Sequence, residues 1–316
     1  MNPSSPSIIA LSGGVGGAKL VSGLSRVMEP GALLVAANTG DDFKHMGLHI
    51  SPDIDSIFYA VTDLNNTETG WGRVGETWNF MEAIKGFGGE DWFNLGDRDL
   101  AMHVLRTHWM GEGQSLSQVT EKFCTSLNVP FTLAPMSDDP VSTIIETDQG
   151  TLPMQDYFVR EHCEPVAKSF YYEGAYTARA NGGLITALTN NDVRAIIICP
   201  SNPYLSIDPI LAIPEIRELL HASQVPIIAV SPIVGGKALK GPLGKIMTEL
   251  GLEPNSLNIA RHYGDLIDIL VIDEGDAGEC SAIKALGIQC HTTPTIMKTV
   301  DDQKALAREI LEISRV

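Results

Sequence analysis

A glycine-rich loop near the N-terminus is the strongest chemical signal in the sequence. It reads SGGVGGAK from Ser12 to Lys19 and follows the short apolar run Ser7 to Leu11. Glycines let a backbone approach a phosphate closely, and the first N–H groups of a following helix attract anions. The loop fits neither the GxxxxGK[ST] pattern of P-loop nucleotide hydrolases nor the GxGxxG spacing of dinucleotide-binding folds. It therefore predicts an anion-binding loop of another kind, and a merely tight turn is the alternative.

Four aspartates form a second group that could do chemistry. Asp41 and Asp42 follow a second apolar run, and Asp53 and Asp55 lie in the segment SPDID at an expected helix start. Carboxylate oxygens on loops near a phosphate site are suitable ligands for Mg²⁺. The alternative for Asp53 is that it only caps its helix.

A third set of charged residues has helical spacing. Asp99, His103 and Arg106 share one face of an expected helix, which would direct a row of charges at one place. The simpler interpretation makes Asp99 a helix cap and Arg98 a solvated surface charge, with His103 structural.

Polar turns also follow apolar runs later in the chain. One contains Ser201 and Asn202 in the sequence PSNP, and another reads SPIVGGK from Ser231 to Lys237. Because α/β folds bind ligands at the carboxyl ends of parallel strands, these turns could meet the glycine loop at one edge of a sheet.

The elements that must position these residues alternate between strand and helix. Buried strands are predicted at 7–11, 32–37, 194–199, 226–230 and 267–272, and helices at 54–62, 77–84, 99–110, 116–127, 212–222, 243–250 and 303–313. Val141 to Thr147 and Thr151 to Phe158 predict a β-hairpin. The pattern predicts a doubly wound, mostly parallel, Rossmann-like α/β sheet. We expect one domain over residues 1–316, with a largely helical insertion at about 56–130.

The composition of the chain excludes some classes of binding partner and indicates its location and the state of its cysteines. The 316 residues carry 22 Lys and Arg against 39 Asp and Glu, a net charge of −17, which repels nucleic acid and anionic membranes. No apolar stretch is long enough to span a bilayer, so the cytoplasm is the expected location. The five cysteines form no CxxC pair, and we expect all of them to be reduced thiols: Cys124, Cys163, Cys199, Cys280 and Cys290.

Together these motifs resemble the 2-phospho-L-lactate transferase family, which makes the deazaflavin coenzyme F420. The resemblance extends from about Ile8 to about Asp276. It is carried, in the family's order, by SGGVGGAKL at 12–20, NTGDD at 38–42, ISPDIDS at 50–56, LGDRD at 95–99, PMSDDPVST at 135–143, PSNP at 200–203 and SPIVGG at 231–236.

The resemblance implies a reaction and a set of site residues. The reaction is the transfer of a phosphorylated three-carbon acid, lactyl or enolpyruvyl, from a guanosine diphosphate conjugate to the terminal hydroxyl of the deazaflavin Fo, with Mg²⁺ and release of GMP. Asp53 and Asp55 would serve the metal or the attacking hydroxyl, and Arg98 would bind near Fo. The remaining implied binding residues are Gly13, Gly14, Gly16, Gly17, Lys19, Asn38, Ser201 and Asn202.

Two other functions remain open from the sequence. One is a non-catalytic, sugar-nucleotide-binding regulatory protein on the same scaffold, which would not need the LGDRD and SPDID motifs. The other is an NAD-dependent oxidoreductase, disfavoured because Asn38-Thr39-Gly40 stands where an acidic ribose ligand is expected. The sequence does not predict which three-carbon acid the guanosine diphosphate donor carries. The helical insertion could supply the interface of a homodimer.

Overall fold

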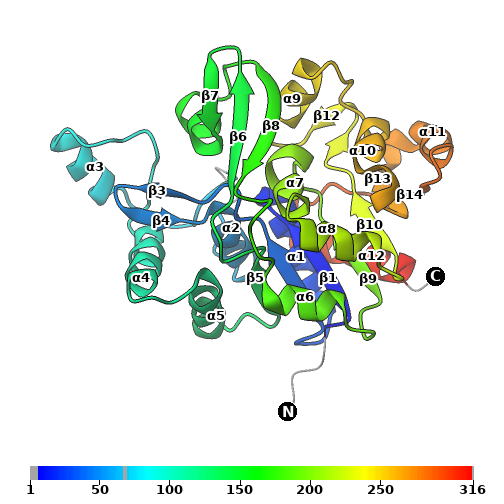
Figure 1. The fold of residues 1–316 in the computed structure, drawn as a ribbon, viewed down its shortest axis with the longest axis horizontal. Coiled ribbons are helices and arrows are strands. Elements are labelled where there is room, and N and C mark those ends of the chain that lie inside the picture. Colours follow the sequence, from blue (N-terminus) through cyan, green and yellow to red (C-terminus); the bar gives the residue numbers. More distant parts are fainter. Residues whose placement is uncertain (1–5, 67–69, 315–316) are drawn as a thin grey trace.

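Seven parallel strands form the central sheet of the protein (Figure 1). The computed structural model describes residues 6–66 and 70–314. The sheet order is β14-β13-β10-β9-β1-β2-β5. The strands are β1 (Ile8–Ser12), β2 (Leu33–Ala37), β5 (Thr132–Pro135), β9 (Ala195–Ile198), β10 (Ile227–Val230), β13 (Ile269–Ile272) and β14 (Gln289–Thr292). Numbered along the chain, this is the order 3-2-1-4-5-6-7, so the predicted doubly wound fold is confirmed.

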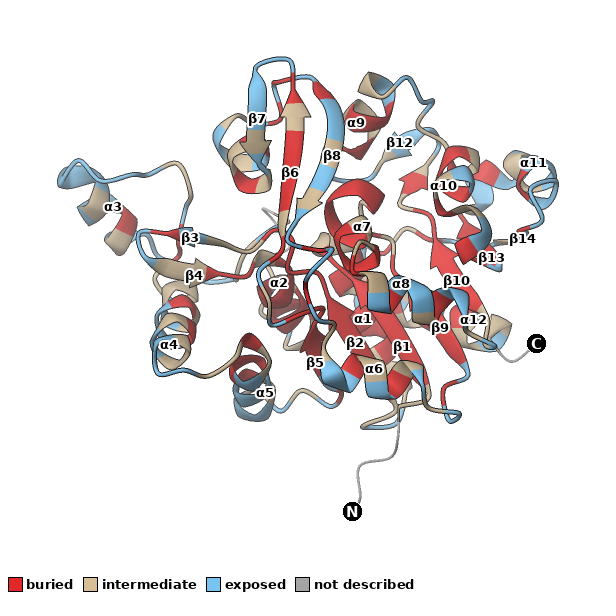
Figure 2. Cartoon of the chain, in the orientation of Figure 1, coloured by how far each residue is buried: buried red, intermediate tan, exposed pale blue. Residues whose placement is uncertain are grey.

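Helices cover both faces of the sheet because its strands are apolar on both sides (Figure 2). Ile8 and Ala10 of β1 face one layer, which contains α1 (Gly14–Val27), α2 (Pro52–Val61) and α12 (Val300–Ile313). Ile9 and Leu11 face the other, which contains α6 (Gly182–Leu188), α8 (Pro214–His221) and α10 (Ser256–Tyr263). The alternation follows from the two-residue period of a strand.

The long connection between β2 and β5, which we call the insertion, includes the segment 56–130 that was expected to be largely helical. It contains a short hairpin, β3 (Phe43–His45) and β4 (Leu48–Ile50), and then α2. Three more helices follow at α3 (Asn79–Gly86), α4 (Asp99–Gly111) and α5 (Leu116–Ser126), all close to their predicted positions. In Figure 1, α3 lies at the tip of an arm that extends away from the central sheet. The hairpin was not predicted, since its strands are only three residues long.

A separate antiparallel sheet has the order β7-β6-β8. Its strands are β6 (Ser142–Thr147), β7 (Gly150–Pro153) and β8 (Ala167–Glu173). The predicted hairpin is confirmed, but its second strand was predicted too long. It ends at Pro153, which lacks an N–H for the ladder, and the chain turns into the π-helix η1 (Asp156–Arg160).

The second half of the chain adds short elements in the connections that follow β9, β10 and β13. They are η2 (Pro203–Ile207), α7 (Asp208–Leu211), β11 (Ile233–Val234), β12 (Lys237–Ala238), α9 (Leu243–Glu249), η3 (Gly264–Leu266), η4 (Glu274–Glu279) and α11 (Cys280–Lys284). In the described part of the chain, no helix is both long enough and apolar enough to cross a bilayer.

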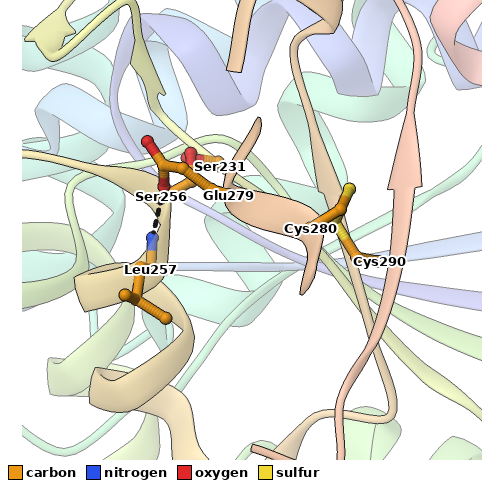
Figure 3. Close-up of a disulfide and its surroundings, with 6 residues drawn as sticks. All are labelled: Ser231, Ser256, Leu257, Glu279, Cys280 and Cys290. Atoms are coloured by element: carbon orange, nitrogen blue, oxygen red, sulfur yellow. Dashed lines mark hydrogen bonds between the residues drawn. A yellow bond between two sulfur atoms is a disulfide. The ribbon is translucent and has the colours of Figure 1, made fainter. Parts of the chain in front are cut away.

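The prediction that all five cysteines are free was wrong. Cys280 and Cys290 form a disulfide between α11 and β14, with Cα atoms 5.4 Å apart (Figure 3). The pairing depends on β14 adding to the edge of the sheet beside β13, which brings residues ten positions apart together. Cys124, Cys163 and Cys199 are free, as expected, and burial raises the pKa of the Cys199 thiol to about 12.

Candidate functional site

The loops after β1 and β9 meet where the strand order reverses. β1 and β9 are neighbours in the sheet, but their connections run to opposite sides. Ser201, 3% exposed, donates from Oγ to the carbonyl oxygen of Gly13 at 2.6 Å. The N–H of Gly13 lies 3.3 Å from the same hydroxyl oxygen. Such a reversal point is where open α/β sheets bind ligands, so the predicted meeting of these two loops is confirmed.

The glycines of the first loop are required by close packing as well as by any ligand. A Cβ at Gly13 would lie 2.4 Å from Asp53 Oδ2, and one at Gly16 would lie 2.2 Å from the carbonyl oxygen of Pro200. Gly14 has φ +63°, which disfavours other residues. The tight-turn interpretation is therefore correct in part, and it does not exclude anion binding, because the first N–H groups of α1 have no intrahelical acceptor.

Asp53 connects the starts of two helices. Its carboxylate accepts from the N–H of Gly14 at 2.5 Å and from Asn38 Nδ2 at 2.9 Å. Ser51, with Pro52 after it, is the N-cap of α2. Asp53 thus bonds to groups outside its own helix, and the interpretation of this residue as a simple cap is wrong. Gly13, Gly14, Asn38, Asp53 and Ser201 form one cluster, which we call the loop cluster.

Asn202 borders the loop cluster from the β9 side. Its Oδ1 accepts from the N–H groups of Tyr204 and Leu205 and thereby begins η2. Leu205 in turn accepts from Asn38 Nδ2 at 3.3 Å. Asn202 Nδ2 is buried and has no partner among the described residues. A buried amide without a partner is costly, so this donor suits a ligand oxygen.

Three neighbouring aspartates leave the site with excess negative charge. Burial raises the pKa of Asp53 to about 6. Burial, followed by repulsion from Asp53 and Asp42, raises the pKa of Asp41 well above its usual range. Burial also raises the pKa of Asp42, against hydrogen bonds from His49 and Ser51. A divalent cation would relieve this repulsion.

The available donor atoms fit Mg²⁺. Asp42 Oδ1 and Thr39 Oγ1 are buried oxygens without a partner in the described residues. The carboxylates of Asp41 and Asp53 offer oxygen ligands of the same kind, which this ion prefers, but in the described residues the carboxylates of Asp41, Asp42 and Asp53 do not all have ligand atoms within 4.8 Å of one another.

Asp55 lies in a different environment from Asp53. It forms a two-point ion pair with Arg106 of α4, in which Arg106 Nη1 lies 3.2 Å from Asp55 Oδ2 and Nη2 contacts Oδ1. His103 Nδ1 lies 3.7 Å from Asp55 Oδ2, and His103 Nε2 lies 3.2 Å from Asp99 Oδ2. The face predicted for Asp99, His103 and Arg106 is thus confirmed, and its target is Asp55.

Asp55, Asp99 and His103 could themselves hold a metal, since one ligand atom from each lies within 4.8 Å of the others. Two features disfavour Mg²⁺ there. The Arg106 guanidinium already neutralises Asp55, and a nitrogen ligand is a poor match for Mg²⁺. The site that sequence reasoning assigned to Asp53 and Asp55 together is therefore divided between two networks.

Two of the other predicted residues, Lys19 and Arg98, bond to groups away from the loop cluster. Lys19 Nζ donates to the carbonyl oxygen of Met297 at 2.8 Å, and burial lowers the pKa of Lys19. Arg98 is exposed at the start of α4. Its N–H, like that of Asp99, donates to the Glu76 carboxylate.

The LGDRD motif has a structural role in this arm. Asp97 accepts from Thr77 Oγ1 and from the N–H groups of Asn79 and Phe80, which lowers its pKa to about 2. Asp97 thus organises the start of α3, while Glu76 caps α4. Reciprocal capping explains these carboxylates without a catalytic role.

The sequence analysis did not single out Thr39 as a site residue. It also did not predict that Arg106 pairs with Asp55. Helical spacing already placed Arg106 beside Asp99 and His103, but no local signal connects it with Asp55, 51 residues away.

Comparison with known proteins identifies the family. The sequence profile of "2-phospho-L-lactate transferase CofD" matches residues 8–301. The chain belongs to this family. It is 39% identical to a phosphoenolpyruvate transferase from Streptomyces griseus over 97% of this chain and 98% of that protein. It is 35% identical to a 2-phospho-L-lactate transferase from Methanosarcina mazei over 96% of this chain and 99% of that protein. The chain is therefore an enzyme of the transferase type, as the resemblance implied.

Solved structures support the fold. A protein of the UPF0052 family from Bacillus halodurans superposes with a TM-score of 0.63 at 15% identity, over 98% of this chain and 99% of that one. At this identity the likeness concerns the fold alone.

Proposed function

We propose that this enzyme transfers a phosphorylated three-carbon acid from its guanosine diphosphate conjugate to the terminal hydroxyl of Fo and releases GMP, in the pathway to F420. The names of its relatives support the chemistry, since they transfer phosphoenolpyruvate or 2-phospho-L-lactate. The observation that carries the proposal is the loop cluster, in which the loops after β1 and β9 meet an uncompensated carboxylate at the reversal point of the sheet.

The donor's diphosphate would lie between the first turn of α1 and the PSNP turn. The N–H groups of Val15 and Gly16 are at the positive end of the helix dipole, and this stretch is partly accessible. Asn202 Nδ2 would supply a donor from the opposite side. These local donors would allow a doubly anionic ligand to bind to a protein of charge −17.

Asp53 and Asp41 would hold Mg²⁺, with Asp42 and Thr39 beside them. When bound, the ion would neutralise charge on the phosphates of the donor. Asp53 would also lie near the Fo hydroxyl, orient it and accept its proton late in the reaction. The hydroxyl oxygen forms a bond to the phosphorus that carries the acid, and the bond from that phosphorus to the oxygen of GMP breaks. The other residues act mainly by positioning.

The test is turnover of the purified enzyme with Fo, Mg²⁺ and either the lactyl or the enolpyruvyl guanosine diphosphate donor. We expect GMP release and a product whose mass equals Fo plus the phosphorylated acid. Asp53→Asn should strongly slow the release of GMP, whereas Asp63→Asn, at an exposed ion pair with Arg26, should not. Tight binding of a guanosine diphosphate without release of GMP from either donor would instead favour a regulatory binding protein.

A further inference from the structure

One buried cation joins α4 to the first turn of α2. The Arg106 side chain is 1% exposed. Its two terminal nitrogens contact the two oxygens of Asp55, and Nη1 also lies 3.4 Å from the carbonyl oxygen of His49. A guanidinium fork fixes the orientation of a carboxylate, which the single ammonium of a lysine does not do.

The polar groups around this guanidinium come from three segments. Asp55 and Tyr59 belong to α2, whereas Asp99 and His103 belong to α4. The Tyr59 hydroxyl donates to Asp99, and Arg106 Nη1 lies 3.2 Å from His103 Nδ1. The segment between β2 and α2 contributes Asp42, in the turn after β2, and His49 of β4, and the Phe123 ring of α5 lies 5.8 Å from the guanidinium carbon. Within the described residues, Arg106 has no hydrogen bond to the glycine loop.

Burying an ion pair between two helices costs desolvation free energy. Apolar side chains of similar volume often join helices equally well or better. Met102 and Trp109 of α4 already pack against the apolar core that α2 shares. What the ion pair adds is an orientation: it holds Asp55 in place, two residues after Asp53 on the same helical turn.

We propose that Arg106 is a positioning residue for the proposed transfer. By fixing Asp55, it holds the first turn of α2 so that the Asp53 carboxylate stays against Gly14 and Asn38. Arg106 thereby sets the affinity of the site for a divalent cation and the rate of turnover, without touching substrate. The proposal rests on the proposed function for its kinetic part only.

The experiment compares Arg106→Lys, which keeps the charge, with the double variant Arg106→Met/Asp55→Leu, which replaces the pair by apolar packing. Thermal unfolding shows whether each variant is folded. Mn²⁺ binding, followed by electron paramagnetic resonance without substrate, reports the cation site directly. We expect both variants to fold and to bind Mn²⁺ about tenfold more weakly, with a similar loss of kcat, as for other groups that support metal ligands. The KM for the donor should change much less than kcat.

Arg26→Lys is the matched control, because Arg26 forms a surface pair with Asp63. It should leave both Mn²⁺ binding and kcat close to wild type. Folded variants of Arg106 with wild-type Mn²⁺ affinity would overturn the proposal and leave Arg106 as a structural clamp. If the wild-type protein binds Mn²⁺ but turns over neither donor, the proposed function fails, and the Mn²⁺ measurement still decides the role of Arg106.

Discussion

Asp53 and Asp55 lie two residues apart on the same turn of α2, yet they have opposite electrostatic environments. Asp53 receives two neutral N–H donors, from Gly14 and Asn38, and has two other carboxylates nearby. Asp55 has a buried guanidinium and an imidazole. Residues i and i+2 on a helix point in different directions, so one turn serves two networks.

We propose that this difference separates a functional carboxylate, Asp53, from a supporting one, Asp55. A carboxylate left without a counter-charge destabilises the folded protein and is poised for a cation or a proton. A carboxylate that is already paired contributes geometry instead. Asp53 is therefore the better candidate for metal and proton chemistry, and Asp55 for its support.

The largest expected effect is on catalysis at Asp53. Asp53→Asn keeps an oxygen acceptor for Gly14 but loses the negative charge, so we expect kcat to fall by roughly 10²–10⁴-fold. Steady-state GMP release measures the loss, and Asp63→Asn is the control. A variant with normal kcat would remove Asp53 from the mechanism.

The next effect concerns stability at Asp55. Asp55→Asn would leave the Arg106 charge buried and poorly compensated, which should lower the free energy of unfolding by about 3–5 kcal/mol. Asp53→Asn should not destabilise the protein. Urea unfolding of both variants tests the contrast, which would be refuted by equal losses of stability.

Asp53 should also make the stability of the protein depend on pH. The pKa of Asp53 is about 6 in the folded protein against an ordinary value of 3.8, so the folded state holds this proton more tightly. Asp53 therefore costs stability as pH rises from about 4 to about 6, by up to about 3 kcal/mol, and the cost persists above pH 6. The Asp53→Asn variant has no ionisable group at this position and therefore does not carry this loss of stability.

Urea unfolding with a chelator present, at several pH values, should show wild type and Asp53→Asn diverging through this window, with the variant more stable at pH 7. If the two stability curves run parallel, Asp53 has its ordinary pKa in the folded protein and the prediction is wrong.

The smallest effect is at the junction of the two loops. Ser201→Ala removes the hydroxyl that bonds to Gly13, and we expect a loss of about 1 kcal/mol in unfolding free energy. Because the loops after β1 and β9 would then be less well aligned, the KM for the donor should rise while kcat changes little. Ser223→Ala, at a partly buried hydroxyl in the turn before β10, is the control.

Much of the fold was predictable because buried parallel strands are continuous apolar runs that are followed by polar turns containing Gly or Pro. Ile8 to Leu11 and Ile227 to Val230 are examples. β14 was missed because its sequence, QCHT, has no apolar run and is half exposed. The disulfide at Cys290 was missed with it, since the spacing of cysteines does not show which strand lies at the edge of a sheet.

The site was predictable only where the signal is local. The glycine loop and the shared face of Asp99, His103 and Arg106 follow from spacing along the chain. The separation of Asp53 from Asp55 does not, because it depends on α4 packing against α2 from about 50 residues away. The hydrogen bond of Lys19 could not be predicted for the same reason, since its acceptor, Met297, lies 278 residues further along.

The sequence alone determined the alternation of strand and helix, the family, and the candidate residues for phosphate and cation binding, because each of these depends on neighbours along the chain. The tertiary structure decided which of them share a charge environment. Whether a carboxylate lies beside a guanidinium or beside another carboxylate depends on how two helices or loops pack, to within a few ångströms. No local sequence pattern encodes that packing.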